Sequence, residues 1–193
     1  HHPLIFMQCG PIRYLVDAKS QAQNRDFSHY IIPRFTAFRS LNSKEKTITQ
    51  IYTEITENAN RNKQIISDAL TALESGRTPI IITERTEHIE LLKNSLTNKC
   101  ENIITLMGKI SAKEKRETME RLSNITDDDK LIIIASGKYI GEGFDYPRLD
   151  TLLLAMPIAW KGKVAQYAGR LHRNYESKNV VQILDYVDIR VRV

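Results

Sequence analysis

Short unbroken apolar runs alternate along this chain with segments in which apolar residues recur every three or four positions. The unbroken runs predict buried strands at Pro79–Thr83, Ile103–Met107, Leu131–Ala135, Thr151–Ala155 and Val180–Leu184. The helical spacing predicts helices at Asn60–Ser75, at Ile89–Leu96 and from a capping box at Ser111 to Leu122. Buried strands separated by amphipathic helices indicate a three-layer α/β domain with a mainly parallel sheet covered on both faces.

Residues 1–40 differ from this pattern. The short apolar run Tyr30–Ile32 stands between the polar stretch Lys19–Ser28 and Pro33. Such a segment is typical of a strand-and-loop connector rather than of a self-contained core. We therefore expect a connector over residues 1–40 and one domain over residues 41–193.

Composition excludes several classes of protein. The 193 residues, 41% of them hydrophobic, suffice for one sizeable domain. No apolar run is long enough to span a membrane, and the first residues lack the features of a signal peptide. The two cysteines and five histidines show no metal-ligand spacing, so we expect no metal site and a reducing, cytoplasmic setting. A net charge of +5 is compatible with a phosphate-rich partner but is ordinary for this length.

The first segment with candidate chemistry is Gly141–Pro147 (GEGFDYP), which follows the strand predicted at Leu131–Ala135. Gly141 and Gly143 permit close backbone approach, and the Asp145 carboxylate suits ribose hydroxyls or a metal-bound water. A dinucleotide fingerprint is excluded, because tyrosine stands at the third glycine position and proline interrupts the helix that the pyrophosphate would need. A plain surface turn remains an alternative.

The second segment is Gln166–Arg173 (QYAGRLHR). On a continuous helix, Gln166, Arg170 and Arg173 would fall within roughly 60° of one another, opposite an apolar stripe that includes Tyr167. Two guanidinium groups and an amide at one exposed place suit a polyphosphate. A solvated basic helix face is the alternative.

Together these segments resemble a known family. The stretch Arg77–Asp185 is similar to the second RecA-like domain of superfamily 2 helicases: Gly141–Pro147 resembles motif V, Gln166–Arg173 resembles motif VI, and Ile80–Thr83 occupies the place of motif IV. The wording of motif V is closer to the type III restriction-like and DNA-repair branches, with DEAD/DEAH relatives, than to DEAD-box RNA helicases.

The resemblance assigns roles to particular residues. It implies that Arg170 and Arg173 are arginine fingers and that Gln166 senses the γ-phosphate region. The nucleotide-coupling positions are Gly141, Gly143 and Asp145. The expected nucleic-acid contacts are Ser136, Gly137, Arg85 and Lys109.

The resemblance also implies a partner domain. The chain contains neither the G-x-x-x-x-G-K-[ST] phosphate loop nor a D-E-x-[HD] magnesium box, so ATP and Mg²⁺ would be held mainly by a preceding RecA-like domain, to which residues 1–40 would connect. The expected function is the C-terminal motor domain of an ATP-dependent helicase or translocase that is inactive as an ATPase alone; DNA is the favoured substrate, and RNA remains the alternative.

Two other classes of protein are alternatives. A non-catalytic nucleic-acid-binding module with a degenerate motor fold would have little reason to keep both arginines and Asp145. A small-molecule α/β enzyme would need a complete glycine fingerprint or a nucleophile–base pair, and the sequence contains neither.

Overall fold

The computed structural model describes Met7 and residues 27–108, 111–141, 144–158, 161–175 and 178–191. In this part of the chain a six-stranded sheet has the order β1-β6-β5-β2-β4-β3, and all of its strand pairs are parallel. The strands are β1 (Ser28–Phe35), β2 (Pro79–Thr83), β3 (Asn102–Leu106), β4 (Leu131–Ser136), β5 (Thr151–Leu154) and β6 (Val180–Val187). The predicted α/β class and parallel sheet are confirmed.

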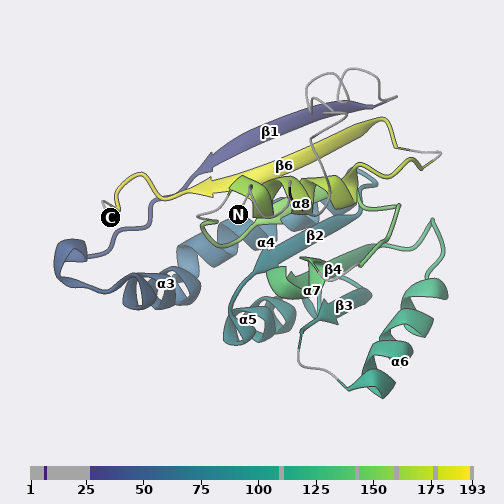
Figure 1. Ribbon diagram of the computed structural model, residues 1–193, viewed down its shortest axis with the longest axis horizontal. Helices are drawn as coiled ribbons and strands as arrows, with labels where there is room; N and C mark the ends of the chain where they lie inside the picture. The colour runs from purple at the N-terminus through teal and green to yellow at the C-terminus, as the bar shows by residue number, and fades with distance from the viewer. Residues whose placement is uncertain are drawn as a thin grey trace.

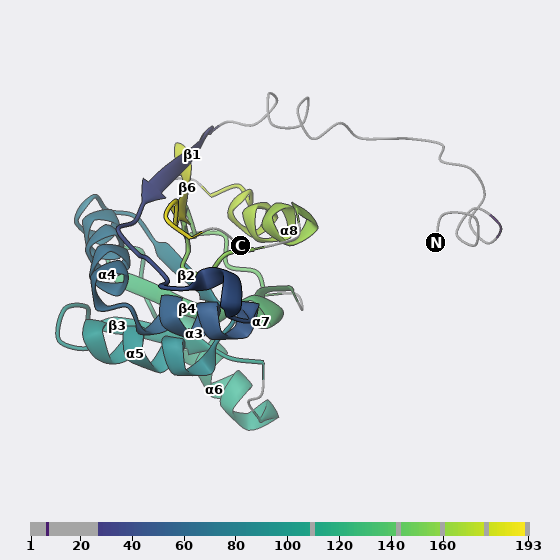
Figure 2. The ribbon, with the colours of Figure 1, turned by 90° about the vertical axis from the view of Figure 1, so that its left-hand side faces the viewer.

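Helices cover both faces of the sheet (Figures 1 and 2). The α-helices are α3 (Ile48–Glu57), α4 (Ala59–Glu74), α5 (Thr86–Leu96), α6 (Ala112–Ser123), α7 (Gly137–Gly141) and α8 (Lys161–Leu171), and a short 3-10 helix η1 (Ser43–Glu45) precedes them. The pair α4 and α5 packs on one face, and α6, α7 and α8 pack on the other. The predicted capping box holds the start of α6, where Ser111 and Glu114 exchange hydrogen bonds.

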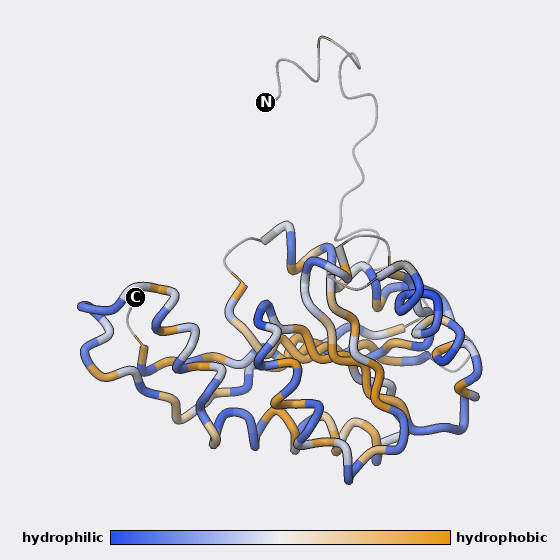
Figure 3. The backbone as a smooth tube through the Cα atoms, turned by 90° about the horizontal axis from the view of Figure 1, so that it is seen from below, coloured by the Kyte–Doolittle hydropathy of each residue, from blue (hydrophilic) through white to orange (hydrophobic). Residues whose placement is uncertain are grey.

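Alternation along the central strands divides the core into two layers. Ile80 and Ile133 point toward α6–α8, whereas Ile81 and Ile132 point toward α4 and α5. All four side chains are almost fully buried, and each such burial contributes about 1.5–3 kcal/mol. The hydrophobic residues concentrate along the sheet in Figure 3. This two-sided burial explains why the strands are unbroken apolar runs.

The strand β1 forms one edge of the sheet, beside β6. The amides of Ser28 and Thr36 donate to carbonyls at the two ends of β6, so the even-numbered amides of β1 face β6 and the odd-numbered positions face the open edge. Pro33 therefore stands where its missing N–H costs no ladder bond. The apolar run that the sequence analysis assigned to a connector is thus part of the sheet.

Buried polar groups fix α4 to the carboxyl ends of the strands. Arg61, 1% exposed, pairs with Asp188 at 3.1 Å and donates to the carbonyl oxygen of Ala155 at 2.6 Å. His88 lies between the Thr83 hydroxyl and the Asn62 side chain, at 3.0 and 2.9 Å. Burial, assisted by the charge of Arg61, lowers the pKa of His88 to about 4, so its ring is neutral at pH 7 and serves the fold.

No helix within the described ranges is long and apolar enough to cross a membrane.

Candidate functional site

The helix α8 presents Gln166 and Arg170 on its outer side. Tyr167 and Leu171, each 1% exposed, anchor the inner side against the sheet, while Gln166 is exposed and Arg170 half-buried. The helix ends at Leu171. The prediction that Arg173 shares its helical face was therefore wrong, because Arg173 lies in the turn that follows.

Arg173 nevertheless meets the predicted partner segment. Its Nε lies 3.2 Å from Asp145 Oδ1, and the two side chains are 53% and 44% exposed. A pair as exposed as this contributes at most about 1 kcal/mol, so either group can exchange it for another partner. The structure thus brings together the two segments that the sequence analysis singled out.

Arg170 is not engaged in the same way. Its Nε is shielded from solvent and, in the described part of the chain, has no hydrogen-bond acceptor. A buried N–H group without an acceptor destabilises the fold, so its presence favours a role in binding a partner. Gly141 is the last residue of α7, whereas Gly143 lies outside the described residues.

The Arg173–Asp145 pair does not lie at the carboxyl edge of the sheet. The segment that carries Asp145 (residues 144–150, called the Asp145 segment below) leads into the start of β5, and Arg173 leads into the start of β6. Because α8 must return the chain to the start of the next parallel strand, its last residues lie near the amino ends. The pair therefore lies at the opposite edge of the sheet from the carboxyl ends of β2 and β4.

A second cluster does lie at the carboxyl ends of β2 and β4. The Tyr167 hydroxyl donates to Glu84 Oε1 at 3.3 Å, and Lys163 Nζ approaches the same oxygen at 3.3 Å. Burial, and then the charge and hydrogen bond of Glu84, raise the pKa of Tyr167 far above its ordinary value, so the hydroxyl remains a donor. Glu84 and Tyr167 are far apart in sequence, and no spacing rule could have paired them.

Gly137 lies under this cluster. A Cβ there would clash with the Tyr167 hydroxyl and lie 2.5 Å from Glu84 Oε1. The residue is buried, so its backbone is not an open phosphate contact as the sequence analysis expected. Ser136, half-buried at the end of β4, accepts a bond from the Tyr139 amide at 3.4 Å.

Two basic side chains lie at or near α7, which follows Ser136 directly. Lys115 Nζ stands 5.6 Å from the centre of the Tyr139 ring, and the exposed Lys138 lies against Gly108. Arg85 lies farther along this edge, at the start of α5, where it donates to the carbonyl oxygen of Thr49 at 3.3 Å. Lys109 lies outside the described residues.

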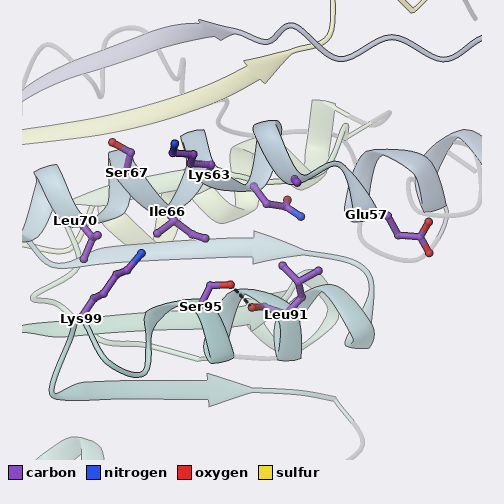
Figure 4. A pocket seen from close by; sticks show the side chains of 10 residues that line it. Glu57, Lys63, Ile66, Ser67, Leu70, Leu91, Ser95 and Lys99 are labelled. Atoms are coloured by element: carbon purple, nitrogen blue, oxygen red, sulfur yellow. Dashed lines mark hydrogen bonds between the residues drawn. The ribbon is translucent and has the colours of Figure 1, made fainter.

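A hollow on the opposite face is a different kind of feature. It lies between α4 and α5 and is lined by apolar side chains such as Leu70 and Leu91, with Lys63 and Lys99 at its rim (Figure 4). None of the predicted site residues lines it. Across the described ranges, no group of three or more His, Cys, Asp or Glu side chains could hold a metal ion.

Comparison with known families gives one match that spans most of the chain. Residues 60–175 match the model of the helicase conserved C-terminal domain. This range contains the Asp145 segment, α8 and the carboxyl ends of β2 and β4.

Individual relatives agree with the family match. The chain is 22% identical over 170 residues to the transcript termination protein A18 of Fowlpox virus (strain NVSL), covering 86% of the chain and 36% of the relative. The A18 protein of Yaba monkey tumor virus (strain VR587) is 26% identical over 132 residues, covering 66% of the chain and 27% of that protein. The chain thus spans about a third of the length of these relatives.

Two solved structures share the fold. T4 UvsW matches with a TM-score of 0.65 at 22% identity, over 83% of this chain and 32% of that one. The C-terminal part of the Fun30 ATPase domain matches with a TM-score of 0.59 at 16% identity, over 72% and 44%. The architecture is that of the C-terminal RecA-like domain of superfamily 2 helicases.

Proposed function

The chain belongs to the family of helicase conserved C-terminal domains, and from that premise we propose that it is one half of an ATP-dependent nucleic-acid motor. The observation that carries the proposal is the contact of Arg173 with Asp145, three residues after Arg170 in the chain. Both side chains of the contact are exposed, so Arg173 is open to another partner, which supports its assignment to a nucleotide site.

The nucleotide side would work through α8 and the turn after it. Arg170 and Arg173, with Gln166, would meet the phosphates of ATP held with Mg²⁺ mainly by a preceding RecA-like domain. ATP supplies the phosphoryl transfer, and the guanidinium groups would offset the charge that develops in it. The residues fit this role, because the Arg170 Nε lacks an acceptor within the described chain and Arg173 has only an exposed, exchangeable one.

Asp145 would serve as the resting partner of Arg173. While no phosphate is in reach, the carboxylate holds the guanidinium at the surface. When a phosphate replaces it, Asp145 becomes available to a ribose hydroxyl or a metal-bound water. Gly141 and Gly143 would allow the backbone before Asp145 to change conformation when Arg173 exchanges its partner.

The nucleic-acid side would lie at the carboxyl ends of β3 and β4. Ser136 with Lys115 and Lys138 offers a hydroxyl and two cations to a phosphate backbone, and Arg85 and Lys109 would extend this surface. Contacts of this kind carry little sequence preference and a strong dependence on salt. We propose DNA rather than RNA as the substrate, on the resemblance of motif V to the restriction-like and repair branches.

The test is Arg170→Ala in the full-length polypeptide that carries this domain. An arginine finger contributes about 10³-fold or more to turnover, so the ATPase rate should fall by at least that factor while nucleotide binding is kept. Arg121→Ala, on an exposed residue of α6, is the matched control and should keep the rate. Full turnover in Arg170→Ala would contradict the finger role and favour a nucleic-acid-binding module without catalysis.

A further inference from the structure

Lys178 lies buried between the Asp145 segment and the end of α8. Its Nζ donates to the carbonyl oxygens of Pro147 at 2.5 Å, Leu171 at 2.9 Å and Arg173 at 2.9 Å. An ammonium group has three donors, so these three bonds use its full capacity. The first acceptor, Pro147, lies two residues after Asp145. The other two, Leu171 and Arg173, belong to the segment that carries Arg170 and Arg173.

The charge at this position is costly to keep. Lys178 is 7% exposed, and burial lowers its pKa to about 8, although Asp150 and Asp145 oppose the shift. An apolar side chain of similar length would fill the space without this penalty. The cation is compensated because it meets carbonyls at the end of a helix, where the backbone dipoles favour positive charge.

The two segments have other contacts that differ in kind. Arg148 holds the Asp145 segment from its other side, by donating to the carbonyls of Thr126, Asp127 and Asp129. Arg173 and Asp145 meet only through exposed side chains. Lys178 instead fixes the backbones of both segments, and backbone position decides where the Arg173 guanidinium can reach.

We propose that Lys178 is a positioning residue that sets the place of Arg173 relative to the Asp145 segment. The inference rests on the proposed function, since it assigns Lys178 no contact with nucleotide. Loss of the ammonium would let the two backbones move independently, and displacement of a charged group by about 1 Å can lower turnover about 10²-fold.

The experiment compares Lys178→Met, Arg173→Ala and the double variant in the full-length polypeptide, with Lys93→Met on α5 as the control. Lys178→Met should lower kcat about 10²-fold, with KM for ATP and binding of single-stranded DNA unchanged. In the Arg173→Ala background, Lys178→Met should have little further effect, because its contribution passes through that arginine. If Lys178 had a merely structural role, Lys178→Met would lower kcat by the same factor in the wild-type protein and in the Arg173→Ala variant.

Each remaining outcome is decisive. Wild-type kcat in Lys178→Met, or equal losses in the two backgrounds, would overturn the positioning role. If Arg170→Ala and Arg173→Ala both keep full turnover, the proposed function itself fails, which is a separate result. If Lys178→Met does not fold, Lys178→Arg carries the same test, since a planar guanidinium cannot point three donors at three converging carbonyls.

Discussion

The Gly137 position shows how a single residue joins two parts of the site. It leaves room for the Tyr167 hydroxyl, which reaches Glu84 at the end of β2. Tyr167 belongs to the same helix as Arg170, and Gly137 follows Ser136 directly. The residues proposed to face the nucleotide and those proposed to face nucleic acid are therefore linked through the packing of the Tyr167 hydroxyl against Gly137.

Replacing Gly137 tests this packing. Gly137→Ala would place a methyl group against the Tyr167 ring and Glu84, and overpacking of this kind costs about 1–3 kcal/mol. We expect the free energy of unfolding in urea to fall by that amount. Adding Tyr167→Phe removes the clashing oxygen, so the double variant should recover part of the loss.

Gly169→Ala provides the opposite control on α8. Nothing lies within 4 Å of a Cβ there, and alanine favours a helix by about 0.5–1 kcal/mol relative to glycine. This variant should gain stability in the same urea titration. A neutral Gly137→Ala beside a stabilised Gly169→Ala would show that the hydroxyl is not packed against Gly137.

At the scale of elements, β1 depends on α4 for its place at the sheet edge. Arg34 on β1 makes a bidentate salt bridge with Asp68 on α4, at 2.7 and 2.9 Å. The Tyr186 hydroxyl of β6 donates to the same carboxylate at 2.9 Å. One carboxylate thus ties two adjacent strands to a helix. The hydrogen bond to Asp68 raises the pKa of Arg34, so the guanidinium remains charged.

Asp68→Ala should release this edge. The change leaves the Tyr186 hydroxyl, on a residue that is 3% exposed, without its acceptor, which costs about 1–3 kcal/mol. We expect that loss in urea unfolding and faster hydrogen exchange at the β1 amides of Ile32 and Arg34. As a control, Lys113→Ala breaks only the exposed salt bridge with Glu117 and should leave both measurements unchanged. Equal hydrogen-exchange rates at β1 in the Asp68→Ala and Lys113→Ala variants would contradict the role of Asp68.

The elements also show which features sequence can predict. The strands β2 and β4 were predicted almost to the residue, because strands buried on both faces are short apolar runs. The edge strand β1 was not placed in the sheet, because its apolar run Tyr30–Ile32 is only three residues long and ends at Pro33. The end of α8 was misjudged because helical periodicity continues through Arg173 although the backbone turns at Leu171.

The site was predictable to a similar extent. Motif order paired Asp145 with the arginines, and the structure places Arg173 against it. Lys178 carried no signal, because its role depends on carbonyl groups brought close by the fold. Gly137 was assigned to phosphate from its motif, whereas its burial under Tyr167 is a tertiary property.

At the scale of the whole molecule, the proposed function requires a second domain. The 193 residues contain no phosphate loop and no acidic magnesium box, and they span about a third of the viral A18 relatives. The arginines have little to act on without phosphates held by a second surface. The domain would contribute only when another RecA-like domain closes against α8.

The purified 193-residue chain should therefore show no ATP hydrolysis that single-stranded nucleic acid stimulates. A phosphate-release assay with and without DNA, and again with RNA, measures this directly. The same chain carrying Arg170→Ala and Arg173→Ala is the control, because any rate that survives in it comes from contaminants rather than from this site. Turnover that rises with nucleic acid and disappears in the double variant would mean that the chain binds and hydrolyses ATP by itself, and the division of labour between two domains would have to be abandoned.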